Sequence, residues 1–219
     1  MKIYDITASI SDDLPVYAGE RPSVVDVMKM ENGDVCNFSA IKFSSHTGTH
    51  CDVPYHFIQD GKNLDEICLK HFYGKAKLFR PKITSNIRVR DIEHIKNIRE
   101  GDIVLFDTGQ SHYMENPVFY EDYYSFTPEV AEYLAVRKVK TVGIDVLSID
   151  PYKAEGFPAH KILLGAGICL LEGLVLKGVP EGEYTLSALP LKFKGGNGSP
   201  VRAVLIRQYR MYAHTIDEL

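Results

Sequence analysis

A short segment in the first quarter of the chain concentrates side chains that bind metals. Residues 46–56 read HTGTHCDVPYH and contain three of the eight histidines of the 219-residue chain, together with Asp52. Imidazole and carboxylate ligands without an obligatory thiolate suit zinc, manganese or iron better than calcium. A single histidine is most often a surface or hydrogen-bonded core residue, but three at even spacings beside a carboxylate indicate a metal site.

The spacing favours a bent, extended loop over a helix. Alternate side chains of an extended segment share one face, which would hold the three histidines and Asp52, whereas Cys51 would point the other way and pack. A flat strand rises about 3.3 Å per residue, so the Cα atoms of His46 and His50 would lie about 13 Å apart, near the limit for sharing an ion. We therefore predict a bend at Gly48, which can adopt the required backbone angles. A helix would place the two histidines one turn apart, but glycine, threonine and proline are poor helix formers.

A second group of candidate ligands lies far along the chain. Glu172 interrupts the apolar run of residues 168–176, where a carboxylate is costly to bury unless positive charge meets it. It either binds a metal or emerges at the end of an element, and the sequence leaves both interpretations open. His160 lies twelve residues upstream, about 120° away on a straight helix. Both can serve one site only if Gly165 and Gly167 break the segment.

The elements that position these residues include two capped helices. Asn63 followed by residues 64–67 predicts a short helix with acidic residues near its amino terminus. Thr127 and Pro128 form a second helix start, and we expect that helix to end near Lys138. The metal-binding loop is therefore expected to run into a helix.

Apolar segments predict a mixed sheet. Residues 103–106, 142–144 and 201–206 form strand-like runs that are apolar on both faces, as in a sheet covered on both sides. Asp107, Asp145 and Asp150 follow apolar runs of this kind; we expect turn-forming and strand-ending roles for them, with hydrogen bonding to a metal-bound histidine as the alternative.

The order of patterns places the chain in the α/β class. It shows mixed strands and helices, no repeat and no linker, so residues 1–219 are expected to form a single domain of mixed β-sheets with flanking helices. A chain of this length buries a sufficient core without a structural metal, so the metal is expected to serve function. His71, His94, His112 and His214 lack ligand spacing and are assigned no function.

Composition excludes several classes of partner. The 25 Lys and Arg residues against 29 Asp and Glu residues give a net charge of −4, without the basic surplus typical of nucleic-acid binding. No apolar run approaches the roughly 20 residues that span a bilayer. The absence of a basic surplus favours a small-molecule partner. The four cysteines lack CxxC spacing and the amino terminus has no apolar signal region, which indicates a reduced, cytoplasmic protein.

Residues 46–56 fit the pattern His-x-Gly-Thr-His-x-Asp-x-Pro-x-His, which resembles that of the Putative cyclase family of metal-dependent hydrolases. This family includes bacterial kynurenine formamidase and isatin hydrolase. The resemblance covers most of the chain, and its other segments are individually less specific. They comprise residues 4–7, 105–109, 143–145, 148–150, His160, Glu172, 188–191 and 198–203.

The resemblance implies a site and an assembly. It implies that His46, His50 and Asp52 hold one metal, and that Asp52 bridges to a second. The second metal would be held by His160 and Glu172, with His56 as catalytic acid and base. The metals would be zinc or manganese, two per subunit, in a swivelling β/β/α fold that forms a homodimer or homotetramer.

The chain departs from the family pattern at two places. Relatives often carry a tryptophan near the amino terminus that lines the substrate pocket, whereas this chain has Val16 and Tyr17 and no tryptophan. After the metal-binding glutamate, relatives commonly have Asn where this chain has Gly173. The first departure bears on substrate identity, and the second removes a polar contact but keeps the ligand.

The expected chemistry is hydrolysis of a C–N bond in a small aromatic formamide or amide. A divalent metal can lower the pKa of water from about 15.7 to about 7 and polarise a carbonyl, and His56 could carry the proton to the leaving amine. Alternatives are a lactam hydrolase of the isatin hydrolase type, a lyase or cyclase using the same metals, and a non-catalytic metal-dependent binding protein.

Overall fold

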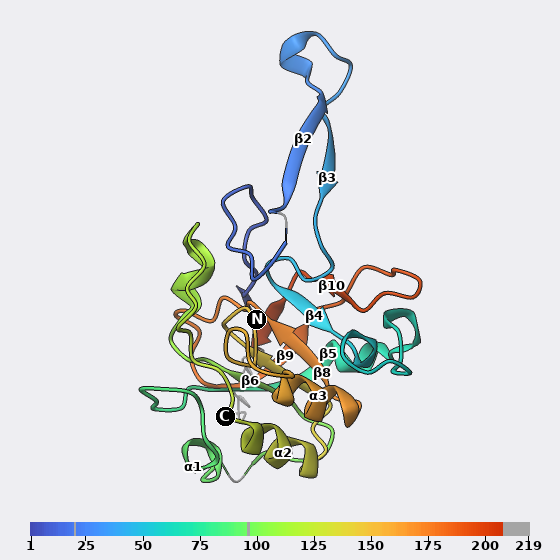
Figure 1. The fold of residues 1–219 in the computed structure, drawn as a ribbon. Helices are drawn as coiled ribbons and strands as arrows, with labels where there is room; N and C mark the ends of the chain where they lie inside the picture. The colour runs from blue at the N-terminus through green and yellow to red at the C-terminus, as the bar shows by residue number, and fades with distance from the viewer. Residues whose placement is uncertain (20, 96, 208–219) are drawn as a thin grey trace, which may run out of the picture.

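The computed structural model describes residues 1–19, 21–95 and 97–207, and most of its strands belong to one large mixed sheet (Figure 1). The strand order in this sheet is β1-β11-β9-β5-β6-β7-β8-β4-β10, and β2 and β3 form a separate hairpin. The strands are β1 (Lys2–Asp5), β2 (Ser23–Met28), β3 (Phe38–Lys42), β4 (His50–Asp52), β5 (Tyr73–Phe79), β6 (Ile103–Phe106), β7 (Thr141–Ile144), β8 (Cys169–Glu172), β9 (Gly182–Ser187), β10 (Gly198–Pro200) and β11 (Val204–Arg207). The α-helices are α1 (Val89–Ile92), α2 (Pro128–Val136) and α3 (Pro158–Gly165), and short 3-10 helices cover Met30–Asn32, Pro54–His56, Leu64–Glu66, Leu69–His71 and Ser111–Glu115.

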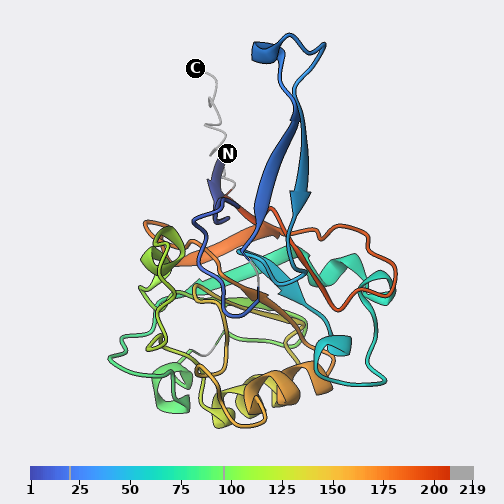
Figure 2. The same cartoon turned by 45° about the horizontal axis from the view of Figure 1, so that its top comes forward.

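The parallel centre of the sheet is buried on both faces. Strands β5, β6, β7 and β8 run parallel, and antiparallel strands flank them on each side. On β6, Ile103 and Leu105 join one hydrophobic core, whereas Val104 and Phe106 join the other. Helices α2 and α3 pack side by side over the second core (Figure 2). This arrangement confirms the α/β class with mixed strands and flanking helices.

The expected helix starts are confirmed. Thr127 precedes α2 with Pro128 at its first position, and the helix ends at Val136, two residues before the expected Lys138. Glu66 accepts a hydrogen bond from the Asn63 backbone N–H at 2.8 Å, which closes the amino-terminal turn of the short helix after the metal-binding loop.

The strand expected over residues 201–206 is wrong in its extent. The structure has β10 (Gly198–Pro200) on one edge of the sheet, paired with β4, and β11 (Val204–Arg207) near the opposite edge, paired with β9 and β1. Pro200 lacks an N–H with which to extend a ladder, and the chain leaves the first edge there. Only residues 201–203 connect the two edges, so the sheet must curl until its ends approach each other.

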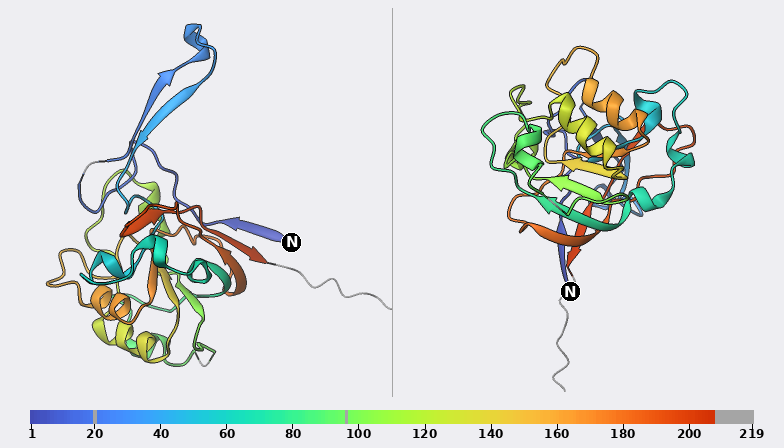
Figure 3. Two further views of the ribbon diagram at one scale, coloured as in Figure 1. Left: turned by 90° about the vertical axis from the view of Figure 1, so that its right-hand side faces the viewer. Right: turned by 90° about the horizontal axis from the view of Figure 1, so that it is seen from below.

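The hairpin of β2 and β3 projects from the body of the protein (Figure 3). Its strands pair antiparallel with a bulge between Asp26 and Met28. Within the described ranges, no helix is both long enough and apolar enough to cross a bilayer.

Candidate metal centre

Two neighbouring antiparallel strands bring the candidate ligands His50 and Glu172 together. Strand β4 pairs with β8 so that His50 lies directly opposite Glu172, although the two residues are 122 positions apart in the chain. Directly paired residues point to the same face of a sheet, and His50 Nε2 accordingly lies 3.4 Å from Glu172 Oε2. His50 Nδ1 donates to the Gly48 carbonyl at 2.8 Å, which turns Nε2 toward the carboxylates.

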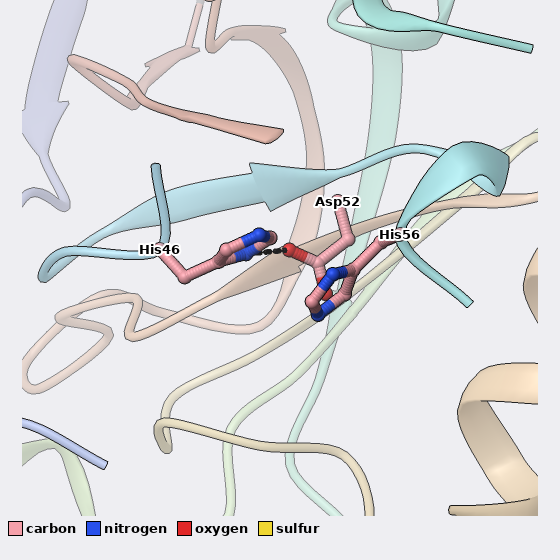
Figure 4. Close-up of side chains that lie close together, drawn as sticks. All are labelled: His46, Asp52 and His56. Atoms are coloured by element: carbon pink, nitrogen blue, oxygen red, sulfur yellow. Dashed lines mark hydrogen bonds and ion pairs between the residues drawn. The ribbon is translucent and has the colours of Figure 1, made fainter. Parts of the chain in front are cut away.

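The histidine segment bends where glycine permits it. Gly48 has a φ of +60°, as the spacing predicted. His46 Nδ1 then reaches Asp52 Oδ1 at 2.7 Å (Figure 4). Only His50–Asp52 is a strand, because a 3-10 turn at Pro54–His56 ends the alternation. That turn stacks the His56 ring on the His46 ring, with centroids 3.9 Å apart.

Cys51 points away from this group, as expected. Its side chain is fully buried in the core formed by the opposite face of the sheet. Cysteine is absent from the metal-binding groups found among the described residues.

His160 enters the site from helix α3. Its Nε2 atom lies 3.2 Å from Glu172 Oε1 and 3.6 Å from Asp52 Oδ2. The break expected between His160 and Glu172 is present, because α3 ends at Gly165 and β8 begins only at Cys169. Gly167 has a φ of +74° within this turn.

Asp150 fixes the orientation of His160. One carboxylate oxygen of Asp150 accepts from His160 Nδ1 at 2.6 Å and from the His160 backbone N–H at 3.0 Å, and the other accepts from the Ala159 N–H at 2.9 Å. Of the two roles expected for Asp150, the structure supports the alternative, hydrogen bonding to a histidine. Its carboxylate also lies at the amino-terminal end of α3, where the helix dipole favours a negative charge. Glu172 is held similarly, since its Oε1 accepts from the Ile149 N–H at 2.7 Å.

The other two carboxylates in similar positions have the expected turn roles. Asp145 accepts from the N–H and hydroxyl of Thr108, and from the Gln110 N–H and Ser111 hydroxyl. Asp107 accepts from the Gly109 N–H and from Arg80. None of these hydrogen bonds of Asp145 and Asp107 involves a histidine.

The ionisable side chains of the site are mostly buried and lie close enough to shift one another's pKa values. Burial opposes ionisation of Asp52, but the nearby imidazole rings of His46 and His160 hold its pKa well below the usual range. Burial also opposes protonation of His160, yet Glu172 and Asp150 raise its pKa well above the ordinary value. Burial lowers the pKa of His56 to about 4. The buried carboxylates of Asp52 and Glu172 therefore favour a positive charge in the space between them.

The residues present fit a divalent metal. Candidate ligand atoms of His50, Asp52 and Glu172 all lie within 4.8 Å of one another, as do those of His46, Asp52 and His56. Asp52 Oδ2 is buried and lacks a hydrogen-bond partner within the part of the chain that the structure describes. A buried anionic oxygen without a donor is costly, and an ion would satisfy it. Asp52 belongs to both groups. The structure places His46 and His50 in different groups, whereas the family resemblance implies that they share one metal.

The candidate ligands face a cavity of about 300 Å³. Its polar side carries His46, His50, His56, His160 and Glu172, and the rest is largely apolar. The lining also includes Val16, Tyr17, Ala18, Ser44, Phe57, Leu147, Ser148 and Phe157. A small, mainly apolar molecule with a polar group at one end matches this distribution.

Some residues of the site carried no local signal in the sequence. Asn197 Oδ1 lies 3.2 Å from His46 Nε2 and comes from a loop 151 positions downstream. Phe57 and Phe157, whose ring centroids lie 5.3 Å apart, join the cavity wall through tertiary packing alone. His71 donates from Nδ1 to the Lys140 carbonyl outside the site, and His214 lies outside the described residues.

Comparison with known proteins yields consistent matches. The Putative cyclase family matches residues 4–151. The kynurenine formamidase of Geobacillus thermodenitrificans is 36% identical over 203 residues, covering 92% of this chain and 95% of the relative. A solved structure described as a potential metal-dependent hydrolase with cyclase activity is 37% identical with a TM-score of 0.82, covering 95% and 99% of the two chains. Isatin hydrolase A from Labrenzia aggregata, solved with benzyl benzoate, is 26% identical with a TM-score of 0.83, covering 94% of each chain.

Proposed function

Because the chain belongs to the Putative cyclase family, we propose that it hydrolyses the formamide of N-formylkynurenine or of a closely similar aryl formamide. It is a metal-dependent amide hydrolase that acts on a small molecule. The observation that carries the choice of substrate is the 36% identity to a kynurenine formamidase along nearly the whole chain. The partly aromatic cavity beside the candidate ligands supports the same choice.

We assign the site residues by combining the contacts with the family pattern. His46, His50 and Asp52 would hold one metal, and Asp52 would bridge to a second held by His160 and Glu172. Asp52 Oδ2 is buried without a hydrogen-bond partner among the described residues, which supports the Asp52 carboxylate as a metal ligand. Zinc and manganese both accept this donor set, and we propose two ions per subunit.

The metal would supply Lewis acidity, activating water as a nucleophile and polarising the formyl carbonyl. The side chains and backbone of the protein would orient the ligands, move the proton and exclude water. Asp150 and the Gly48 carbonyl orient the rings of His160 and His50. The His56 imidazole lines the cavity and would accept a proton from the attacking water and donate it to the departing aryl amine. The apolar lining would exclude competing water from the reacting carbonyl.

The decisive test is hydrolysis of N-formylkynurenine by protein loaded separately with zinc and with manganese. Kynurenine absorbance would be followed against a metal-stripped control. Metal-dependent turnover is the expected result. Protein that demonstrably holds metal and leaves N-formylkynurenine intact would contradict the proposed substrate.

A lactam is the second candidate substrate, because isatin hydrolase A shares the fold at 26% identity. Hydrolysis of a lactam breaks the same type of C–N bond but leaves the amine attached to the product. Isatin should therefore be assayed in parallel. A kcat/KM for isatin above that for N-formylkynurenine would favour the lactam hydrolase.

We propose that the projecting hairpin joins subunits into a homodimer or homotetramer. Its exposed side chains include Val25, Phe38 and Ile41, which are 57%, 56% and 59% exposed. An isolated two-stranded hairpin is marginally stable in water, so a second copy covering this apolar surface would stabilise it. Light scattering should show an oligomer that dissociates in Val25→Lys/Phe38→Lys. Val118→Lys, a change at an exposed valine outside the hairpin, should leave the oligomer intact; equal masses for all three proteins would contradict the proposal.

We further propose a single domain over residues 1–219 in a reducing, cytoplasmic setting. Strand β1 near the amino terminus pairs with β11, so the two ends of the described chain belong to the same sheet. This pairing supports one domain. Cys36 and Cys68 are exposed free thiols, which fits a reducing compartment.

A further inference from the structure

Phe157 adopts a backbone conformation that phenylalanine disfavours. Its φ and ψ are 49° and 64°, in the left-handed region where bulky residues are genuine outliers. It also precedes Pro158, and residues before proline favour extended conformations. Phe157 is the N-cap of α3 but makes no capping hydrogen bond through its side chain, a position where Ser, Thr, Asp or Asn is preferred.

The surroundings hold this conformation in place. The Phe157 N–H donates to the Ala154 carbonyl at 3.4 Å, and its carbonyl accepts from the Lys161 N–H at 3.1 Å. Asp150 takes over the capping role by accepting from the Ala159 and His160 backbone N–H groups. The helix start is therefore supported without any polar contribution from the Phe157 side chain.

The ring of Phe157 faces the cavity next to the candidate metal ligands. It packs on Phe57, with ring centroids 5.3 Å apart at 49°, and lies edge-on to His160 at 6.1 Å. Phe57 in turn lies 4.6 Å from the His160 ring and 4.5 Å from the His56 ring. Both phenylalanines are only half-buried and line the cavity, so the pair presents aromatic surface to whatever enters.

Strained backbone persists where the surrounding structure enforces it, and such strain clusters at functional sites. We propose that Phe157 is a specificity-determining residue, whose left-handed backbone is retained because it places the phenyl ring beside Phe57 as the wall that receives the aromatic ring of the substrate. This inference rests on the proposed function for the identity of the substrate. The strain itself can be measured without any substrate.

Two substitutions separate strain from ring. Phe157→Ala removes the ring and keeps a Cβ in the left-handed region, whereas Phe157→Gly removes the ring and also relieves the strain. We expect Phe157→Gly to melt about 2–6 °C above Phe157→Ala, which reverses the usual order of the two residues. Lys138, with a φ of 53° beyond the end of α2 and away from the cavity, should show the same order for Gly and Ala.

The ring is tested by substrate preference. We expect both Phe157 variants to lower kcat/KM for N-formylkynurenine about tenfold through KM, because aromatic contacts and buried apolar area are lost. Hydrolysis of an aliphatic N-formyl amino acid should change less than about threefold. Phe157→Leu, which keeps apolar bulk without a flat ring, should fall between Phe157→Ala and the wild type, and Lys138→Gly should match the wild type.

The outcomes are distinguishable. An unchanged preference between aromatic and aliphatic substrates in Phe157→Ala, or a Phe157→Gly variant no more stable than Phe157→Ala, would overturn the inference. If the wild type hydrolyses neither formamide, the proposed function fails. Binding of 2-aminoacetophenone, measured by ligand-detected NMR, then decides the role of the ring: about tenfold weaker binding in Phe157→Ala supports it, and equal binding refutes it.

Discussion

Replacing Asp150 by Asn should weaken metal binding through His160, without removing any proposed ligand. The Asp150 carboxylate accepts three hydrogen bonds, from His160 Nδ1 at 2.6 Å and from two backbone N–H groups at 2.9 and 3.0 Å. Asparagine has one oxygen. If that oxygen serves His160, the amide NH2 meets the Ala159 N–H, so one buried donor loses its acceptor and the negative charge behind His160 disappears.

The magnitude follows from these losses. An unsatisfied buried donor costs about 1–3 kcal/mol, which we expect as the loss in free energy of unfolding of the metal-free protein. Loss of a residue that orients a metal-binding histidine typically lowers metal affinity or activity about 10- to 100-fold. That range corresponds to about 1.4–2.7 kcal/mol. We expect this loss in zinc affinity and in kcat/KM for Asp150→Asn.

Zinc affinity would be measured by competition with a chromophoric chelator, and kcat/KM with N-formylkynurenine. Asp145→Asn is the matched control, because Asp145 is also a fully buried carboxylate but its four donors come from Thr108, Gln110 and Ser111. It should lose stability and keep zinc affinity. Wild-type affinity in Asp150→Asn, or an equal loss in Asp145→Asn, would refute the reasoning.

Three further predictions follow from the site and the core. His56→Ala should keep its metal content by elemental analysis while turnover falls about 100-fold or more, whereas His112→Ala, at an exposed position, should leave both unchanged; loss of metal in His56→Ala would make His56 a ligand instead. Stripping the metal with a chelator should lower the melting temperature reversibly, because the ion binds only the folded cluster, and a metal-independent melting temperature would contradict this. A thiol reagent at pH 8 should modify two cysteines in the native protein and four in denaturant. The reason is that burial raises the pKa of Cys169 to about 12 and that of Cys51 well above its ordinary value. Rapid reaction of all four native thiols would be inconsistent with this fold.

Local sequence determined those features that depend on neighbouring residues. The ligand types and their spacing in residues 46–56 indicated a metal site, and Gly48 located the bend. Thr127 and Pro128 marked the start of α2, and Gly165 and Gly167 marked the break between α3 and β8. These signals are readable because capping, glycine conformations and strand periodicity act over a few residues.

Tertiary structure decided which distant groups meet. The sequence left Glu172 open between a ligand and the end of an element, and only the register of β4 on β8 places it opposite His50. The sequence offered hydrogen bonding to a histidine only as the alternative role of Asp150, because its three bonds to Ala159 and His160 act across nine and ten positions through the fold. Residues 201–206 read as one strand, yet residues 201–203 connect two edges of the curled sheet and only residues 204–206 belong to a strand, β11. Such pairings depend on burial and register across the whole chain, where one residue of slip would turn every ligand on a strand to the other face.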